Sequence, residues 1–181
     1  MKDRRDAGLA LARLCVAIDE RFPARSGLRT VWTTGRMTLK PGAPSIIPGR
    51  GEMLFQIRDD NLEVIERLEA LLRELAYETG TRNGCEFEIK RIRTGEPAMM
   101  DERFQHAIEQ AALIWAAGKS IRMPSGAGHD AQVLATMMPA GMLFVPSIGG
   151  ISHHWNENTG DADIVQGAEV FVETCRRLLA S

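Results

Sequence analysis

The chain has 181 residues, of which 44% are hydrophobic and 25% are charged, and its formal net charge is −2. It is long enough to bury one full core or two small ones, and its charge gives no basic surface for phosphate backbones or anionic lipids, so neither nucleic acid nor membrane is expected as a partner. No apolar run approaches the ~20 residues that cross a bilayer, and acidic residues interrupt the basic start, unlike in a signal peptide, so we expect a cytoplasmic protein.

The first half of the chain alternates between helical and extended patterns. Apolar residues recur every three to four positions in the helical segments and every second position in the extended ones. The patterns predict, in chain order, a helix over 6–22, a strand over 28–39, a second strand that includes 53–58, a helix between Asp60 and Gly80, and a third strand around 85–89. Asp60 with Glu63 forms a possible capping box, and Gly80 is the expected C-cap. Together these elements indicate an open-faced α+β sandwich with one strand absent from the usual βαββαβ pattern.

The character of the sequence changes after Pro97, where we place a boundary between a domain at 1–97 and a domain at 98–181. A new helical pattern follows in MMDERFQHAIEQAALIWAAG, and the apolar run MLFVP at 142–146 has the composition of a buried strand. The last segment begins with acids and ends with arginines, the order that the helix dipole favours, so a helix is predicted at the end of the chain.

Polar residues in four places are candidates for a functional site. Arg58 stands at the carboxyl end of the second strand, on the face opposite Phe55, and is either the solvated end of a strand or a clamp for an anion. Ser45 and Arg50 lie among glycines and prolines, so this segment is either part of a binding site or a simple turn.

Two glycine-containing loops, SGAGHDA at 125–131 and GGISHHWNE at 149–157, carry three of the four histidines. His129, His153 and Glu157 are residue types that bind zinc-like metals, and the two loops could line one cleft. The alternative is that His129 packs at the start of a helix while His153 and His154 are solvated. The sequence contains no HExxH or CxxC motif, and this favours the alternative.

Four stretches, in this order, resemble the N-carbamoyl-L-amino acid hydrolases: RRDAGLALARL, PSIIPGRGEMLFQIRD, MPSGAGHDAQVLA and FVPSIGGISHHWNE. This family includes β-ureidopropionase and allantoate amidohydrolase and belongs to the two-metal aminoacylase and carboxypeptidase clan. The resemblance implies a mixed α+β and α/β chain: a ferredoxin-like lid (dimerisation) domain lacking its first strand at 1–97, followed by the C-terminal α/β segment of a zinc-peptidase-like catalytic domain at 98–181. It also implies a homodimer formed through the lid.

The resemblance assigns roles to five residues. It implies that His153 is the last metal ligand, that Arg58 grips the carboxylate of a small substrate, and that Ser45 replaces an asparagine that contacts the same substrate in many members. It further implies that Gly150 binds substrate and that His129 faces the site from its loop as a catalytic residue.

The function that follows is metal-dependent hydrolysis of a linear amide or ureido C–N bond in an N-carbamoyl-L-amino acid or a similar small substrate. Two divalent metal ions, zinc or manganese, would activate water in the complete enzyme. The family takes its other metal ligands from a long N-terminal region, so we expect this chain to be a C-terminal portion that is inactive alone. The alternatives are a non-catalytic dimerisation or regulatory fragment, and a dipeptidase or aminoacylase of the same clan.

Overall fold

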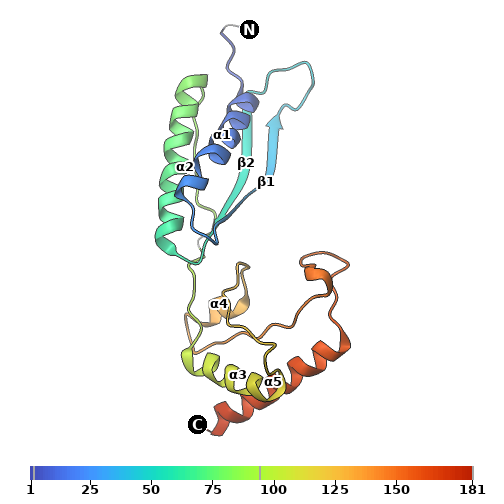
Figure 1. Ribbon diagram of the computed structural model, residues 1–181. Coiled ribbons are helices and arrows are strands. Elements are labelled where there is room, and N and C mark those ends of the chain that lie inside the picture. The colour runs from blue at the N-terminus through green and yellow to red at the C-terminus, as the bar shows by residue number, and fades with distance from the viewer. Residues whose placement is uncertain (2, 94, 181) are drawn as a thin grey trace. The chain divides into compact units, whose positions relative to one another are not determined.

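A computed structural model describes residues 1, 3–93 and 95–180, and the chain divides into two compact units, Met1–Pro97 and Ala98–Ser181. The first unit holds α1 (Ala7–Arg21), the 3₁₀ turn η1 (Pro23–Arg25), β1 (Val31–Lys40), β2 (Arg50–Arg58) and α2 (Leu62–Asn83) (Figure 1). The second holds α3 (Glu102–Trp115), α4 (Asp130–Leu134), the 3₁₀ turn η2 (Ile148–Gly150) and α5 (Asp161–Ala180). The fold is therefore mixed, with one small sheet and several helices. None of the helices formed by the described residues is long and apolar enough to span a membrane.

Local side-chain bonds set the ends of the two helices of the first unit. The Asp6 carboxylate accepts a hydrogen bond of 2.9 Å from the Leu9 N–H and begins α1. Asn61 caps α2 in the same way, so the predicted cap at Asp60 is wrong by one residue. The predicted end at Gly80 is also wrong, because α2 continues to Asn83 and Gly84 ends it with a φ of 61°, a left-handed conformation that costs glycine little.

The sheet of the first unit is an antiparallel hairpin. Val31 lies opposite Arg58 and Lys40 lies opposite Arg50, with an irregularity between Thr34 and Arg36. Because successive side chains on a strand point to opposite faces, Trp32, Met53, Phe55 and Ile57 share one face of the hairpin, and this inner face packs against the core. Both predicted strands are confirmed, the first as 31–40 and the second as 50–58.

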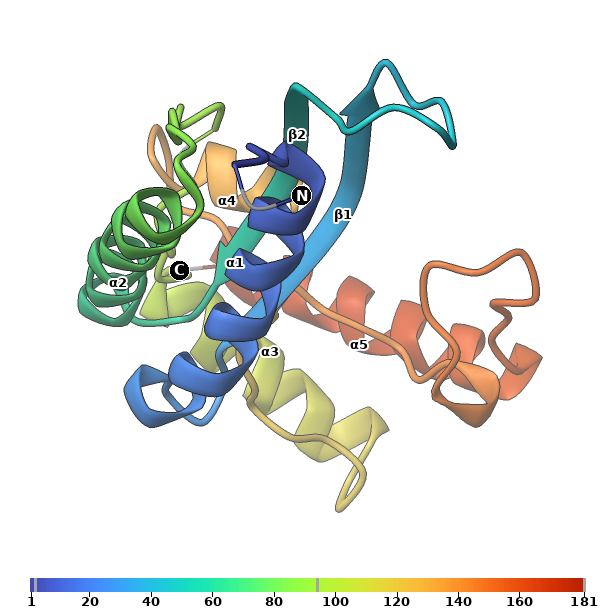
Figure 2. The same ribbon diagram turned by 90° about the horizontal axis from the view of Figure 1, so that it is seen from above.

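The core of the first unit lies between the two helices and the inner face of the hairpin, as the view from above shows (Figure 2). Phe22 is completely buried, and its ring meets those of Trp32 and Phe55 edge to face at centroid distances of 5.5 and 5.8 Å. The other buried apolar side chains of this core come from α1 and α2: Leu14, Ile18, Val64, Leu68, Leu71, Leu72, Leu75 and Ala76.

The predicted third strand, around 85–89, is wrong as a hydrogen-bonded strand, because the sheet formed by the described residues contains only β1 and β2. Its side-chain alternation is nevertheless present: Phe87 and Ile89 are half-buried against the core, while Glu88 and Lys90 are exposed. Alternation shows which side chains face a core, whereas a strand also requires a hydrogen-bonded neighbour.

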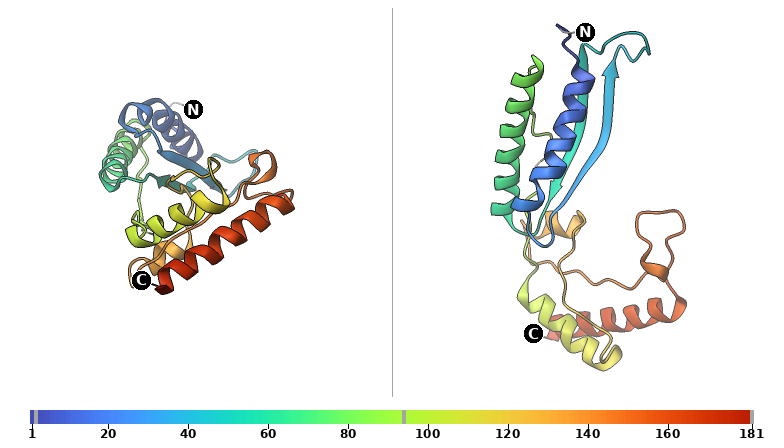
Figure 3. Two further views of the ribbon diagram at one scale, coloured as in Figure 1. Left: turned by 60° about the horizontal axis from the view of Figure 1, so that its bottom comes forward. Right: turned by 45° about the horizontal axis from the view of Figure 1, so that its top comes forward.

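In the second unit, α3 and α5 lie side by side (Figure 3). Ala111 and Ala112 of α3 pack with Val170 of α5, and small side chains allow the two helices to approach closely. The Gln166 amide of α5 donates a hydrogen bond of 2.8 Å to the backbone carbonyl of Trp115, at the end of α3. Both helices were predicted from the sequence and are confirmed.

The predicted buried strand at 142–146 is wrong. No strand is assigned among the described residues of the second unit, and Phe144 and Val145 are 53% and 40% exposed. Val145 does contact α5, because a Cβ added at Gly167 would lie 2.3 Å from its Cγ1. An apolar run becomes a buried strand only where neighbouring strands pair with it, and the described residues of this unit supply none.

Candidate functional site

Arg58 is the last residue of β2 and projects from the outer face of the hairpin, because its neighbour Ile57 packs against the core. It is half-buried, so the long side chain is partly held by its surroundings. Asp59 follows directly and is fixed by the Thr30 hydroxyl and by the Asn61 N–H at 2.9 Å. Burial raises the pKa of the Asp59 carboxyl, but these hydrogen bonds outweigh it and hold the pKa below its ordinary value.

The outer face of the hairpin is positively charged. The register places Arg36, Lys40, Arg50 and Arg58 on this face together with a single acid, Glu52. The Glu52 carboxylate pairs with Arg50 at 2.7 Å, at the far end of β2 from Arg58. A small carboxylate that approaches this face therefore meets an excess of guanidinium and ammonium groups, which attract it and can form charge-assisted hydrogen bonds.

Ser45 is exposed in the loop 41–49 that joins β1 to β2. This loop lies at the end of the hairpin where Lys40 faces Arg50, whereas Arg58 lies at the opposite end (Figure 1). The eight steps from Arg50 to Arg58 span roughly 27 Å at the ordinary rise of a strand. The structure therefore does not bring Ser45 and Arg58 of one chain together around a small substrate.

His129 precedes α4 as its N-cap residue, but its side chain makes no cap hydrogen bond. The imidazole Nε2 instead lies 2.7 Å from the Ser125 hydroxyl oxygen, and the ring lies against Phe144 with the centroids 5.2 Å apart. The prediction that this histidine lies at the start of a helix is thus confirmed. Its ring is hydrogen-bonded to Ser125.

The loop that carries His153 is closed by Glu157. The Glu157 carboxylate accepts a hydrogen bond of 2.8 Å from the His153 N–H, and the Glu157 N–H donates to the His154 carbonyl at 2.9 Å. His153 is exposed and has a φ of 55°, a conformation that is rare for residues other than glycine. Gly150 has a φ of 69°, so a glycine suits the backbone there, although no atom beyond its own residue and its two chain neighbours lies within 4 Å of where its Cβ would be.

The described residues do not assemble a metal centre. No group of three or more His, Cys, Asp or Glu side chains among them is placed to hold an ion. No hydrogen bond joins His129 to His153, and in Figures 1 and 3 α4 lies away from the loop around η2. A zinc site takes three or four protein ligands, so residues 1, 3–93 and 95–180 do not by themselves fit the two-metal centre that the resemblance implies.

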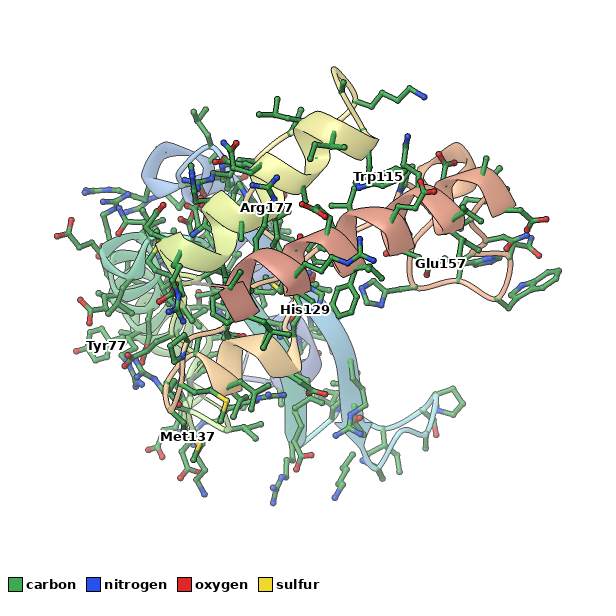
Figure 4. The ribbon with its side chains drawn as sticks, turned by 90° about the horizontal axis from the view of Figure 1, so that it is seen from below. Tyr77, Trp115, His129, Met137, Glu157 and Arg177 are labelled. Atoms are coloured by element: carbon green, nitrogen blue, oxygen red, sulfur yellow. The ribbon has the colours of Figure 1, made fainter. Side chains whose placement is uncertain are left out.

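Two features of the site do not follow from the sequence patterns. The sequence gives Ser125 no distinct role, although its position four residues before His129 in a short loop lets the two side chains meet. The sequence presents Glu157 as a metal-binding residue type, whereas the structure shows its carboxylate bonded to the loop backbone. Figure 4 labels His129 and Glu157, which come from separate loops.

Comparison with known proteins shows which family the chain as a whole matches. The sequence profile of the peptidase family M20/M25/M40 matches residues 12–177. An allantoate amidohydrolase of Bacillus subtilis is 36% identical over 81% of the chain and 35% of its own length. An N-carbamoyl-L-amino acid amidohydrolase of Geobacillus stearothermophilus is 32% identical over 98% of the chain and 43% of its own length.

A solved structure agrees with these relatives. The crystal structure of an amidase of the hydantoinase/carbamoylase family from Burkholderia phymatum is 40% identical and superposes with a TM-score of 0.83 over 98% of the chain and 43% of its own length. The chain thus spans about two fifths of the length of the proteins that it matches.

Proposed function

Because the chain belongs to the peptidase family M20/M25/M40, as the resemblance predicted, we propose that it is part of a hydrolase of linear amide or ureido C–N bonds. The substrates that we propose are N-carbamoyl-L-amino acids or related small compounds. Relatives named as allantoate and N-carbamoyl-L-amino acid amidohydrolases support this substrate class. The observation in the structure that carries the proposal is Arg58 at the end of β2, on a positively charged face.

Arg58 would hold the carboxylate of the substrate. A guanidinium presents two parallel N–H groups that match the two oxygens of a carboxylate, and partial burial limits the side-chain entropy lost on binding. Holding the carboxylate would orient the ureido group for attack and use binding energy for alignment. This orientation is the contribution that we assign to the first unit.

The second unit would contribute His129, Gly150 and His153. His129 would act on the reacting group as a proton donor or acceptor, and the backbone at Gly150 would line the substrate site. His153 is proposed as one ligand of a divalent metal ion, zinc or manganese. Since the described residues do not form a metal centre, any such ion requires further ligands.

Association through the first unit would explain how Ser45 and Arg58, which lie far apart in one chain, could contact the same substrate. We propose that the chain forms a homodimer through this unit and that Ser45 approaches the substrate held by Arg58 of a second copy. The length of β2 supports this arrangement, because one copy alone cannot place both residues against a substrate only a few ångströms long.

The carboxylate role of Arg58 can be tested in an active protein that contains this chain. Arg58→Lys keeps the charge but loses the two-point contact, so kcat/KM for N-carbamoyl-L-amino acids should fall about tenfold or more, as expected for a charge-assisted hydrogen bond of ~1.5–3 kcal/mol. Arg36→Lys, on the same face of the hairpin, is the matched control and should change kcat/KM less than twofold. Unchanged kinetics in both Arg58→Lys and Arg58→Ala would refute the proposal.

The pairing of two copies can be tested with the same protein. Arg58→Ala and Ser45→Trp chains, each impaired alone, should recover part of the activity when they are mixed and reassembled, because a mixed dimer contains one site with both residues intact. Failure to recover activity in mixed dimers that are shown to form would place both residues in one chain's site and would contradict the proposed arrangement.

A second candidate function is a non-catalytic association module. It is favoured by the lack of a metal-binding group among the described residues. Metal content separates the two candidates when it is measured on a protein that contains this chain together with further metal ligands, because a catalytic assembly of this class should retain divalent ions through dialysis, whereas an association module should not.

A further inference from the structure

The surroundings of the hydrogen bond between Ser125 and His129 favour the serine hydroxyl as its donor. The Ser125 oxygen already accepts a hydrogen bond of 3.3 Å from the Ala127 N–H. It lies 2.7 Å from Nε2 of His129, at the short limit of the 2.7–3.2 Å range for bonds donated by nitrogen and at the most frequent separation for bonds donated by a hydroxyl. The hydroxyl hydrogen is therefore best placed on the line to Nε2.

The other contacts of His129 hold the ring without using its second nitrogen. Phe144 lies against the ring at 5.2 Å with an angle of 57° between the planes. The backbone carbonyl of His129 accepts from the Gln132 N–H at 3.0 Å, which anchors the residue at the start of α4. Within the described residues Nδ1 has no hydrogen-bond partner, so it is available to a ligand.

From these contacts we propose that Ser125 is a positioning residue that holds neutral His129 in the tautomer protonated at Nδ1. If Nε2 accepts the Ser125 hydroxyl, the single proton of the neutral ring resides on Nδ1, which then presents an N–H donor. Free imidazole side chains in water prefer the other tautomer, so the serine reverses the intrinsic preference. No proton is transferred in this step, because the serine only selects where the ring proton resides.

The consequence for catalysis rests on the proposed function. An Nδ1–H donor held on a half-buried ring can donate a hydrogen bond to an oxygen that gains negative charge as a ureido carbonyl is attacked. Loss of the Ser125 hydroxyl would leave the ring in place but return most of its population to the tautomer protonated at Nε2. The effect should appear in the rate of the chemical step and not in substrate binding.

The tautomer can be measured in the chain itself. Long-range ¹H–¹⁵N correlation spectra of the ¹⁵N-labelled chain at about pH 8, where an ordinary histidine is neutral, report which ring nitrogen carries the proton. The signals of His129 are identified by their loss in His129→Gln. We expect an Nδ1–H ring in the wild-type chain, a shift of most of the population to Nε2–H in Ser125→Ala, and retention of Nδ1–H in Ser125→Thr.

Ser147→Ala, which removes another half-buried loop serine of the same unit, is the matched control and should leave the His129 tautomer unchanged. An Nε2–H ring in the wild-type chain, or the same tautomer in wild type and Ser125→Ala, would overturn the proposal. These spectra require no catalytic activity, so they decide the role of Ser125 even if the proposed function fails.

The kinetic consequence is tested separately in an active protein that contains this chain. Ser125→Ala should lower kcat roughly threefold to tenfold, which corresponds to the loss of one ordinary hydrogen bond. KM should stay within twofold of the wild-type value, and Ser125→Thr should restore kcat. A change confined to KM would show that Ser125 supports the shape of the binding site, and would refute its action through the His129 tautomer.

Discussion

Truncating Phe22 tests how the first unit holds β2, and with it Arg58, in place. The side chain is 0% exposed and meets Trp32 and Phe55 edge to face, so it links α1 to both strands of the hairpin. Phe22→Ala removes the ring and leaves a cavity, which costs ~3–5 kcal/mol for a buried phenylalanine. The two aromatic contacts favour the upper part of that range, because each adds ~0.5–1.5 kcal/mol beyond burial.

The assay is urea unfolding followed by far-ultraviolet circular dichroism, with thermal unfolding as a second measure. A loss of this size should lower the melting temperature of a unit of this length by about 15 °C or more. Tyr77→Ala is the matched control, because Tyr77 lies on α2 and is 77% exposed (Figure 4). It should change stability by no more than ~0.5 kcal/mol. Equal losses in the two variants would refute the packing argument.

Three further predictions concern charge, metal and association. Hydrogen bonds from Arg73 and Arg91 lower the pKa of Glu69 in the folded state. These bonds therefore stabilise the folded state at pH values above the ordinary glutamate pKa, and this stabilisation is lost as the pH falls through the folded-state pKa. Glu69→Gln should therefore cost about 0.5–1 kcal/mol at pH 7 and almost nothing near pH 3 in urea titrations. Glu66→Gln, at an exposed position of the same helix, is the control and should change the free energy of unfolding by no more than ~0.5 kcal/mol at pH 7. The chain alone should retain less than one equivalent of zinc or manganese after dialysis and hydrolyse no N-carbamoyl amino acid; stoichiometric metal with activity lost in His153→Ala would contradict this. Light scattering at high micromolar concentration should show a dimer or larger species, and a monomer would refute association through the first unit.

Periodicity and capping residues alone located most elements of this chain. The apolar stripes predicted the four long helices, and alternation around Phe55 predicted β2 and placed Arg58 on its outer face. These features follow from contacts between residues a few positions apart, which determine backbone conformation and the face that turns inward. The quoted motifs also identified the family that the comparisons confirm.

The tertiary structure decided which extended segments pair as strands and how far apart the candidate site residues lie. The segment around Phe87 alternates like a strand but lacks a hydrogen-bonded neighbour, and the run at 142–146 is partly exposed because no strand among the described residues flanks it. The hairpin places Ser45 and Arg58 at opposite ends, and the loop before α4 brings the Ser125 hydroxyl to the ring of His129. A sequence records which side chains are compatible with burial or bonding, but the partner that meets each one depends on how distant segments pack.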